Sequence, residues 1–285
     1  MIEKIRSSIQ EFLQRQPESK RQVMRRRLKS LVRSALKVLG ALHFPMLTLA
    51  RLSGTDKISG HNYIDTYQQF FSPYRNRKIT LLEIGVGGYD VAEGGHSLNL
   101  WEAYFQRGTI VAIDLHDKTQ LSRDRVQVHQ CSQVDRPGLE ALARHYGGFD
   151  LVIDDGSHLN VHQIETFQLL FPLMKKEGVY VVEDTQTSYW PAFGGGSVGT
   201  AGHAASAVSF FKGLVDGVNY AEFLPSARGT PTELQQSIRG IYFEHNMIVI
   251  VKGDNTARSN VDMDARAYEL EHRAASHAGD LRSDP

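Results

Sequence analysis

From Lys78 onward, short runs of β-branched residues alternate with segments of helical periodicity, and this alternation constrains the fold more than any other feature. It is typical of βαβ units, which build a parallel sheet with helices packed on it. Helices are predicted over 97–106 and 161–174, the first with Leu98, Trp101 and Phe105 facing inward. In the second, Ile164, Phe167 and Phe171 face inward. The strands predicted here are 79–84, 109–114, 126–130, 151–154 and 179–183.

Residues 241–251 predict two further strands, broken near 244–246, and so tight a connection favours an antiparallel pair. The expected fold is therefore α/β: a Rossmann-like, seven-stranded sheet, mostly parallel with an antiparallel last strand and helices on both faces. Ligands of such sheets bind in a crevice at the carboxyl ends of the strands.

A glycine-rich loop follows the first strand and reads Glu83-Ile-Gly85-Val-Gly87-Gly-Tyr-Asp90. Glycines at this turn let a ligand approach the backbone closely. A dinucleotide fingerprint would require glycine at position 90, where the chain has Asp90, and no Gly-Lys-Ser/Thr follows to make a P-loop. A pyrophosphate ligand is therefore disfavoured.

Polar residues at the strand ends indicate another ligand. Glu83 would repel a phosphate but attract an ammonium group, and Asp114 stands where an acid accepts hydrogen bonds from ribose hydroxyls. Ser132, Gln133 and Asp135 follow the third strand, where side chains can contact an adenine edge. An amine, a ribose and an adenine without phosphates describe S-adenosylmethionine.

Carboxylates also gather at the ends of the fourth and fifth strands. The fourth strand ends in Asp154-Asp155-Gly-Ser-His158 and the fifth in Glu183-Asp184, so both clusters are expected to reach the same crevice. Converging carboxylates repel one another unless a cation lies between them, and oxygen ligands favour Mg²⁺ over Zn²⁺. His158 is interpreted as a general base, because imidazole titrates near neutral pH.

Two other interpretations of the fourth-strand cluster stay open. His158 and His162 are four residues apart and could share a helix face in a zinc site, although H-E-x-x-H is absent and no cysteine accompanies them. Alternatively, Asp154, Asp155 and His158 could cap the start of a helix, although capping does not require carboxylates at two strand ends.

These motifs resemble the class I S-adenosylmethionine-dependent methyltransferases, whose sheet has seven strands with the last antiparallel. Glu83, Gly85 and Gly87 match that class's E/D-x-G-x-G motif, and Asp114 its ribose-binding acid. D-D-G-S-H, followed 28 residues after Asp155 by E-D-T-Q-T, resembles the Mg²⁺-dependent sugar O-methyltransferases of the mycinamicin type. The lead-in from position 56 to 67 is also similar to that family. Relatives methylate deoxysugars of natural products, rhamnose of glycolipids, and mannose of methylmannose polysaccharides.

The resemblance implies S-adenosylmethionine and Mg²⁺ as cofactors and a carbohydrate acceptor. It implies His158 and Asp155 as catalytic residues, with metal ligands Asp155, Glu183 and Asp184. The implied cofactor-binding residues are Glu83, Gly85, Gly87, Tyr63, Asp114, Ser132, Gln133, Asp135 and Asp154. The mycinamicin type carries a substantial extra N-terminal domain, so its substrate contacts and oligomer interface do not transfer to the short basic segment found here.

Aromatic residues open a segment rich in Gly, Ala and Ser over 191–205. Its composition is that of a mobile loop, which could close over a site or be an ordinary surface connection. Tyr189, Trp190 and Phe193 could stack on a sugar face of the substrate or pack the base of this loop.

The formal net charge of zero conceals two unlike parts. Residues 1–60 hold 13 basic and 4 acidic residues, a net charge of +9, which leaves −9 for 61–285. From Lys20 to Lys37 there are eight basic residues and no acidic one. This segment predicts a basic amphipathic helix whose basic face holds Arg26, Lys29, Arg33 and Lys37 and whose apolar face holds Leu28, Leu31, Val32, Ala35 and Leu39.

We expect this helix to pack on the main domain or on a second subunit, which favours a homo-oligomer. Peripheral membrane contact through residues 20–39 is a second interpretation. Nucleic-acid binding is disfavoured, because the core contains no RNA-reading motif. A further enzyme interpretation, methylation of a catechol-like hydroxyl, also suits a metal site.

Three segments are expected: a basic helical extension over 1–60, a methyltransferase domain over 61–255, and a polar, flexible tail over 256–285. No apolar run reaches the roughly 18 residues that span a bilayer. The single cysteine, Cys131, excludes an intramolecular disulfide. These features predict a cytoplasmic protein.

Overall fold

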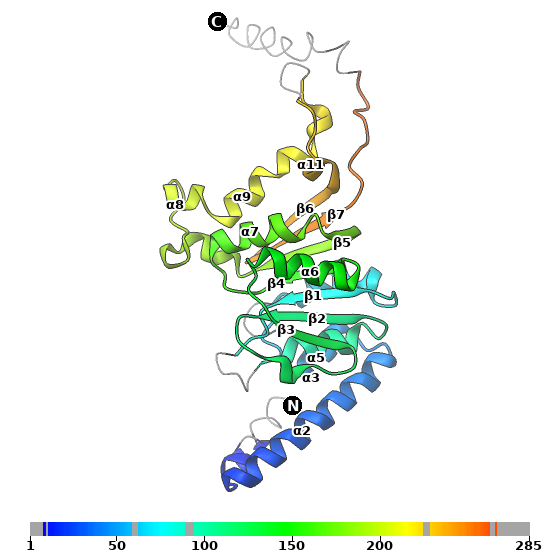
Figure 1. The fold of residues 1–285 in the computed structure, drawn as a ribbon, viewed down its shortest axis with the longest axis vertical. Coiled ribbons are helices and arrows are strands. Elements are labelled where there is room, and N and C mark those ends of the chain that lie inside the picture. Colours follow the sequence, from blue (N-terminus) through cyan, green and yellow to red (C-terminus); the bar gives the residue numbers. More distant parts are fainter. Residues whose placement is uncertain are drawn as a thin grey trace, which may run out of the picture.

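The computed structural model describes residues 8–9, 11–58, 62–88, 94–224, 229–262 and 266 of the 285-residue chain. A seven-stranded sheet lies at its centre, with helices on both faces and a long helix at one end (Figure 1). The strand order is β3-β2-β1-β4-β5-β7-β6. The strands are β1 (Thr80–Ile84), β2 (Thr109–Asp114), β3 (Val126–Gln130), β4 (Phe149–Asp154), β5 (Met174–Glu183), β6 (Ile238–Glu244) and β7 (Met247–Lys252).

The strand pairing confirms the predicted topology. β1 pairs in parallel with β2 and β4, β2 with β3, and β4 with β5. β7 is antiparallel to both β5 and β6. Three predicted strand starts were wrong: β4, β5 and β6 begin earlier than expected, at Phe149, Met174 and Ile238. The helix predicted over 161–174 consequently ends at Leu170, because the chain enters β5 four residues later.

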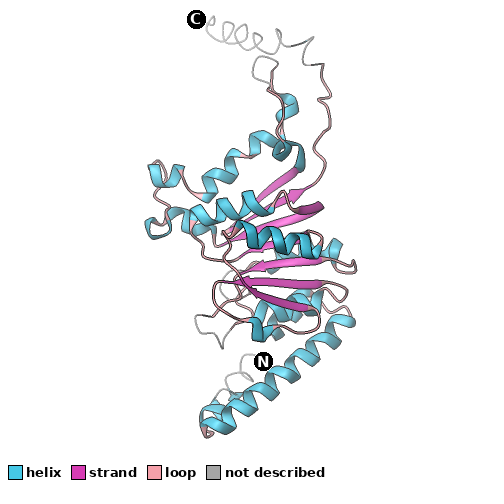
Figure 2. Ribbon diagram, viewed as in Figure 1, coloured by secondary structure: helices cyan, strands magenta, loops and turns pink. Residues whose placement is uncertain are grey.

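Helices cover both faces of the sheet (Figure 2). Alternate strand residues point to opposite faces, so neighbouring leucines of β1 belong to different clusters: Leu81 packs with α3, α4 and α5, and Leu82 with α6, α7 and α9. The helices are α2 (Glu18–Ala41), α3 (Met46–Ser53), α4 (Ile64–Phe71), α5 (His96–Tyr104), α6 (Arg136–Tyr146), α7 (Asn160–Leu170), α8 (Ala201–Ala204), α9 (Ala207–Gly213), α10 (Val215–Val218) and α11 (Glu233–Ser237).

The predicted basic helix is α2. It packs against α3 and α5, which is the expected packing on the main domain. Its fully buried residues are Leu36 and Gly40, and of the predicted apolar face Val32 and Leu39 are partly buried against the same cluster, so the face was only partly predicted. Gly40 is needed at this contact, because a Cβ there would lie 2.0 Å from the carbonyl oxygen of Ala103. Lys37, assigned to the solvent face, instead contacts Glu102 at 3.2 Å, and Leu31 is 67% exposed.

The expected division at residue 60 follows charge more than packing, since Leu36, Met46 and Leu49 belong to the same hydrophobic cluster as Leu81. Most of the tail expected after residue 255 lies outside the described residues. No helix within the described ranges combines the length and the hydropathy needed to cross a membrane.

Candidate active site

The carboxyl ends of the central strands bring the predicted residues to one edge of the sheet. The register places Ile84 of β1 beside Ile113 of β2 and Asp154 of β4, and pairs Asp154 with Val182 of β5. The loops that follow these strands therefore start side by side, and they carry the glycine motif, Asp155 and Asp184.

The glycine loop begins at Gly85, which adopts a φ of +84°. A Cβ at this position would lie 2.1 Å from the carbonyl oxygen of Asp155, so only glycine allows the loops after β1 and β4 to approach each other. Gly87 has a φ of +70° with open space around it. Residues 89–93 of this loop, including Asp90, lie outside the described residues.

Asp114 and Lys118 hold the described part of this loop. Asp114 Oδ2 accepts a hydrogen bond from the amide of Val86 at 3.0 Å. The fully buried Lys118 donates to the carbonyl of Gly88 at 2.7 Å and also to that of Gly87. Sequence reasoning missed Lys118, although its position four residues after Asp114 places it next to that carboxylate.

Glu83 is fully buried at the end of β1. It accepts hydrogen bonds from Ser97 Oγ at 2.9 Å and Trp101 Nε1 at 3.1 Å. Burial raises the pKa of Glu83 to about 7, against the lowering effect of Lys57. The ammonium group next to Glu83 in this structure belongs to Lys57, at 3.7 Å, and contact with a cofactor amine stays a prediction.

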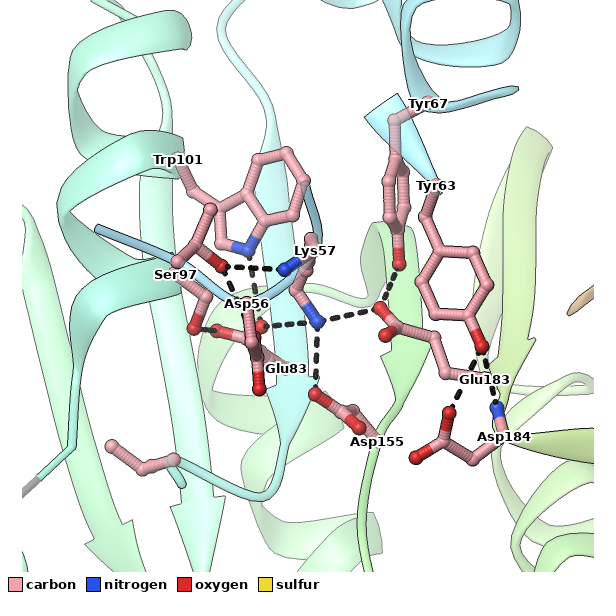
Figure 3. Close-up of polar contacts among 12 residues, drawn as sticks. Asp56, Lys57, Tyr63, Tyr67, Glu83, Ser97, Trp101, Asp155, Glu183 and Asp184 are labelled. Atoms are coloured by element: carbon pink, nitrogen blue, oxygen red, sulfur yellow. Dashed lines mark hydrogen bonds and ion pairs between the residues drawn. The ribbon is translucent and has the colours of Figure 1, made fainter. Parts of the chain in front are cut away.

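Lys57 is a site residue to which the sequence assigned no role. Its Nζ lies 2.8 Å from Asp155 Oδ2 and 2.6 Å from Glu183 Oε1 (Figure 3). Tyr67 donates to the same Glu183 oxygen. Burial lowers the pKa of Lys57, but the neighbouring carboxylates outweigh it and hold this pKa well above its ordinary value. Burial also raises the pKa of the Glu183 carboxyl.

A possible metal-binding cluster consists of Asp155, His158 and Asp184, whose ligand atoms all lie within 4.8 Å of one another. His158 Nε2 is 3.6 Å from Asp184 Oδ2, and Tyr63 donates to Asp184 Oδ1 at 2.9 Å. Two residues of the predicted metal set thus meet here, while Glu183 lies deeper, against Lys57. Tyr63 contacts this cluster, and its contact with a cofactor stays a prediction.

The two alternatives for the fourth-strand cluster do not match the structure. His162 is hydrogen-bonded to Ser157 Oγ at 2.8 Å and does not belong to the three-residue cluster, which argues against a zinc pair with His158. Helix α7 begins after Leu159, and no side chain caps it, so the aspartates do not serve as its cap.

Gln133 and Asp154 form a buried support beneath the β4 loop. Gln133 Nε2 donates to Asp154 Oδ1 at 3.1 Å, and Gln133 Oε1 accepts from the amide of Ser157 at 2.8 Å. Burial raises the pKa of Asp154 to about 7. Ser132 Oγ accepts from Val134, and Asp135 is exposed at the start of α6. Cofactor contacts of these four residues stay predictions.

Tyr189 and Trp190 lie in the segment after β5, and their side chains are 44% and 48% exposed. Tyr189 stacks on His203 with 5.4 Å between ring centroids, and Trp190 packs on Phe193 at 5.9 Å. The glycine-rich segment contains ordered turns and α8, and Asn160 donates to the carbonyl of Phe193 at 2.9 Å. The aromatics thus pack at the base of this segment and keep exposed surface; closure over a substrate stays a prediction.

Known proteins with similar sequences modify sugars. The 8-demethyl-8-alpha-L-rhamnosyl tetracenomycin-C 2'-O-methyltransferase of Streptomyces olivaceus is 41% identical over 215 residues, covering 75% of this chain and 56% of that protein. The mycinamicin VI 2''-O-methyltransferase of Micromonospora griseorubida is 38% identical over 196 residues, covering 68% and 49%. The chain belongs to the class I S-adenosylmethionine-dependent O-methyltransferases.

A solved structure of this family supports the same assignment. The MycE methyltransferase of the mycinamycin pathway, in complex with Mg, SAH and mycinamycin VI, matches with a TM-score of 0.73 at 35% identity, covering 81% of this chain and 59% of that one. No protein-family model matches the chain. The chain spans about half the length of the curated sugar O-methyltransferases that it matches, at 56% and 49%.

Proposed function

We propose that this protein transfers a methyl group from S-adenosylmethionine to a hydroxyl of a sugar, in a Mg²⁺-dependent reaction. The observation that carries the proposal is the convergence of Asp155, His158 and Asp184 beside the glycine loop of β1. The acceptor is a sugar of a glycoside, oligosaccharide or polysaccharide precursor, such as a methylmannose or rhamnose unit. Support for the sugar comes from the relatives, which carry glycosylated natural products in their names.

The residues of the site fit both cofactors. Gly87 leaves the backbone open to a ligand, while Gly85 lets the β4 loop approach the glycine loop. Asp114 lies at the end of β2, where ribose hydroxyls bind in this class of sheet. For the metal, Asp155 and Asp184 supply the carboxylate oxygens that Mg²⁺ prefers. Within the described residues, Glu183 Oε1 accepts the bonds from Lys57 and Tyr67, and we assign Oε2 to the metal.

When bound, the cofactor supplies an activated methyl group and the metal lowers the pKa of the acceptor hydroxyl. His158 Nε2 takes the hydroxyl proton, and Asp184 Oδ2, 3.6 Å away, stabilises the resulting imidazolium. Asp155 and Asp184 fix the direction of the hydroxyl, so positioning supplies much of the rate. Tyr189 and Trp190 offer exposed rings to the sugar face.

Methyl transfer by the purified protein tests this proposal directly. It is incubated with S-adenosylmethionine and a panel of macrolide glycosides, rhamnosides and mannosides, with catechols as the competing acceptor class, and products are followed by mass spectrometry. We expect a methylated sugar that disappears in EDTA and returns with MgCl₂. Undiminished turnover after complete metal removal would exclude the Mg²⁺-dependent mechanism, and turnover of catechols alone would exclude the sugar.

We further propose that the enzyme is a cytoplasmic homo-oligomer with α2 at the interface. Six residues of α2 and its C-terminus follow the alternating four- and three-residue spacing of a coiled-coil seam, and none of them is buried. They are Met24, Leu28, Leu31, Ala35, Val38 and Leu42. The net charge of +9 over 1–60 complements the −9 of 61–285, so a second copy offers the basic helix a segment of opposite net charge.

A further inference from the structure

The ammonium group of Lys57 lies between the two halves of the proposed site (Figure 3). Lys57 belongs to the connection between α3 and α4, and its side chain is 1% exposed. On one side is Glu83, at the start of the glycine loop and 3.7 Å away. On the other are Asp155 at 2.8 Å and Glu183 at 2.6 Å, which follow β4 and end β5.

Without a cation between them, these three carboxylates would repel one another. Glu83 and Glu183 are both buried, and buried like charges oppose one another's ionisation. A buried charge that lacks a partner is also strongly destabilising. A lysine ammonium has three donors and no acceptor, so one group can serve all three carboxylates.

We propose that Lys57 is the built-in counter-ion of the site, which assembles Glu83, Asp155 and Glu183 before Mg²⁺ binds. The identity of the two ligands rests on the proposed function. Lys57 contacts Asp155 through Oδ2 and Glu183 through Oε1, which would leave the second oxygen of each carboxylate for the metal. Lys57 is thus a positioning residue that acts through three carboxylates and couples the cofactor half of the site to the metal half.

Tyr67 provides a matched control, because its hydroxyl donates to the same Glu183 oxygen as Lys57. Tyr67→Phe removes a neutral donor and keeps the cation, whereas Lys57→Met removes the cation and keeps a similar volume. A merely structural role for the buried hydrogen bonds would affect the two variants alike. A counter-ion role predicts that only in Lys57→Met do cofactor affinity and thermal stability become dependent on the metal.

The experiment measures two quantities in EDTA and in saturating MgCl₂ for the wild type and both variants: affinity for S-adenosylhomocysteine (SAH) by calorimetry, and the midpoint of thermal unfolding. In EDTA, Lys57→Met should bind SAH at least about tenfold more weakly than the wild type, and MgCl₂ should restore most of the loss. Its Mg²⁺-induced rise in midpoint should exceed that of the wild type by several degrees. Tyr67→Phe should follow the wild type in both.

Unchanged SAH affinity in EDTA together with an unchanged Mg²⁺-induced rise would overturn the proposal. If Lys57→Met does not fold, the double variant with Glu183→Gln decides, because it removes one negative charge together with the positive one: a folded double variant supports the counter-ion role, and an unfolded one overturns it. If the wild type fails to bind SAH or to transfer methyl groups, the proposed function fails, while the unfolding midpoints still test Lys57.

Discussion

His158 and Asp184 both adopt backbone conformations that side-chain-bearing residues seldom occupy. Their φ angles are +57° and +54°, in the left-handed region. Such conformations cost free energy and persist where the surrounding structure enforces them, as at functional sites. Here the enforcement includes the bonds from Tyr63 to the Asp184 carboxylate and to the carbonyl of Asn246. The strain brings an imidazole and a carboxylate to 3.6 Å.

The base role of His158 predicts a selective loss of rate. His158→Ala should lower kcat by about 10²–10⁴-fold, the usual contribution of general-base catalysis, and leave SAH affinity near that of the wild type. His162→Ala is the matched control, because His162 lies four residues away and is bonded to Ser157 outside the cluster. Steady-state kinetics and calorimetry measure the two effects. Equal losses of rate and cofactor affinity in the His158 variant would count against the base.

Asp154 predicts a dependence of stability on pH. Burial raises its pKa in the folded protein to about 7, from an unfolded value of 3.8. The native state therefore holds this proton longer than the unfolded state, and the stabilisation is lost as the pH rises toward 7. Between pH 5 and pH 8 the loss amounts to roughly 2–3 kcal/mol. Asp154→Asn removes this titration. In urea unfolding, the free energy of unfolding of the variant should therefore rise relative to that of the wild type as the pH rises. A pH-independent difference would contradict the prediction.

At the scale of elements, the sheet was predictable because each strand carries its own signal. Runs of β-branched residues between helical segments define the strands. For a buried parallel strand, such an apolar run is enough to predict it from the sequence. The inward face of α2 was not predictable in the same way. Leu36 and Gly40 are buried because α5 packs there, and two apolar faces on one helix leave the choice to tertiary contacts. Lys57 was missed for a related reason: its three partners lie at the ends of three separate strands, in or directly after them.

The loop after β1 allows a test of why its glycines are required. Gly85 and Gly87 share a left-handed conformation, but a Cβ at Gly85 meets the Asp155 carbonyl at 2.1 Å while one at Gly87 meets no atom within 4 Å. Gly87→Ala should cost only the backbone strain, about 1 kcal/mol. Gly85→Ala must also displace the β4 loop, and we expect it to cost about 3 kcal/mol or more. Urea unfolding without ligands measures both, and equal costs would show that the loops do not need this close contact.

At the scale of the whole molecule, charge and apolar surface separate in the same helix. The basic residues Arg26, Lys29 and Arg33 lie on a different face of α2 from the seam of Leu31 and Val38. An anionic membrane would best attract basic side chains that border the apolar surface it contacts. Arg26, Lys29 and Arg33 are directed away from the seam, although Arg27 and Lys20 border it. We expect a second copy of the chain on this surface, because the seam supplies apolar contact and residues 61–285 supply the opposite net charge.

This arrangement predicts that self-association depends on the seam and not on the active site. Leu31→Glu combined with Val38→Glu places two carboxylates in the apolar contact, which should weaken association by roughly 3 kcal/mol, or about a hundredfold. Ser30→Glu with Ser34→Glu adds the same charge to exposed polar positions of the same helix and is the control. Light scattering coupled to size-exclusion chromatography should show an oligomer for the wild type and the control, and a monomer for the seam variant. The seam variant should keep its SAH affinity, because Leu31 and Val38 touch neither the sheet clusters nor the proposed site. A monomeric wild type that sediments with anionic vesicles would instead assign the seam to a membrane surface.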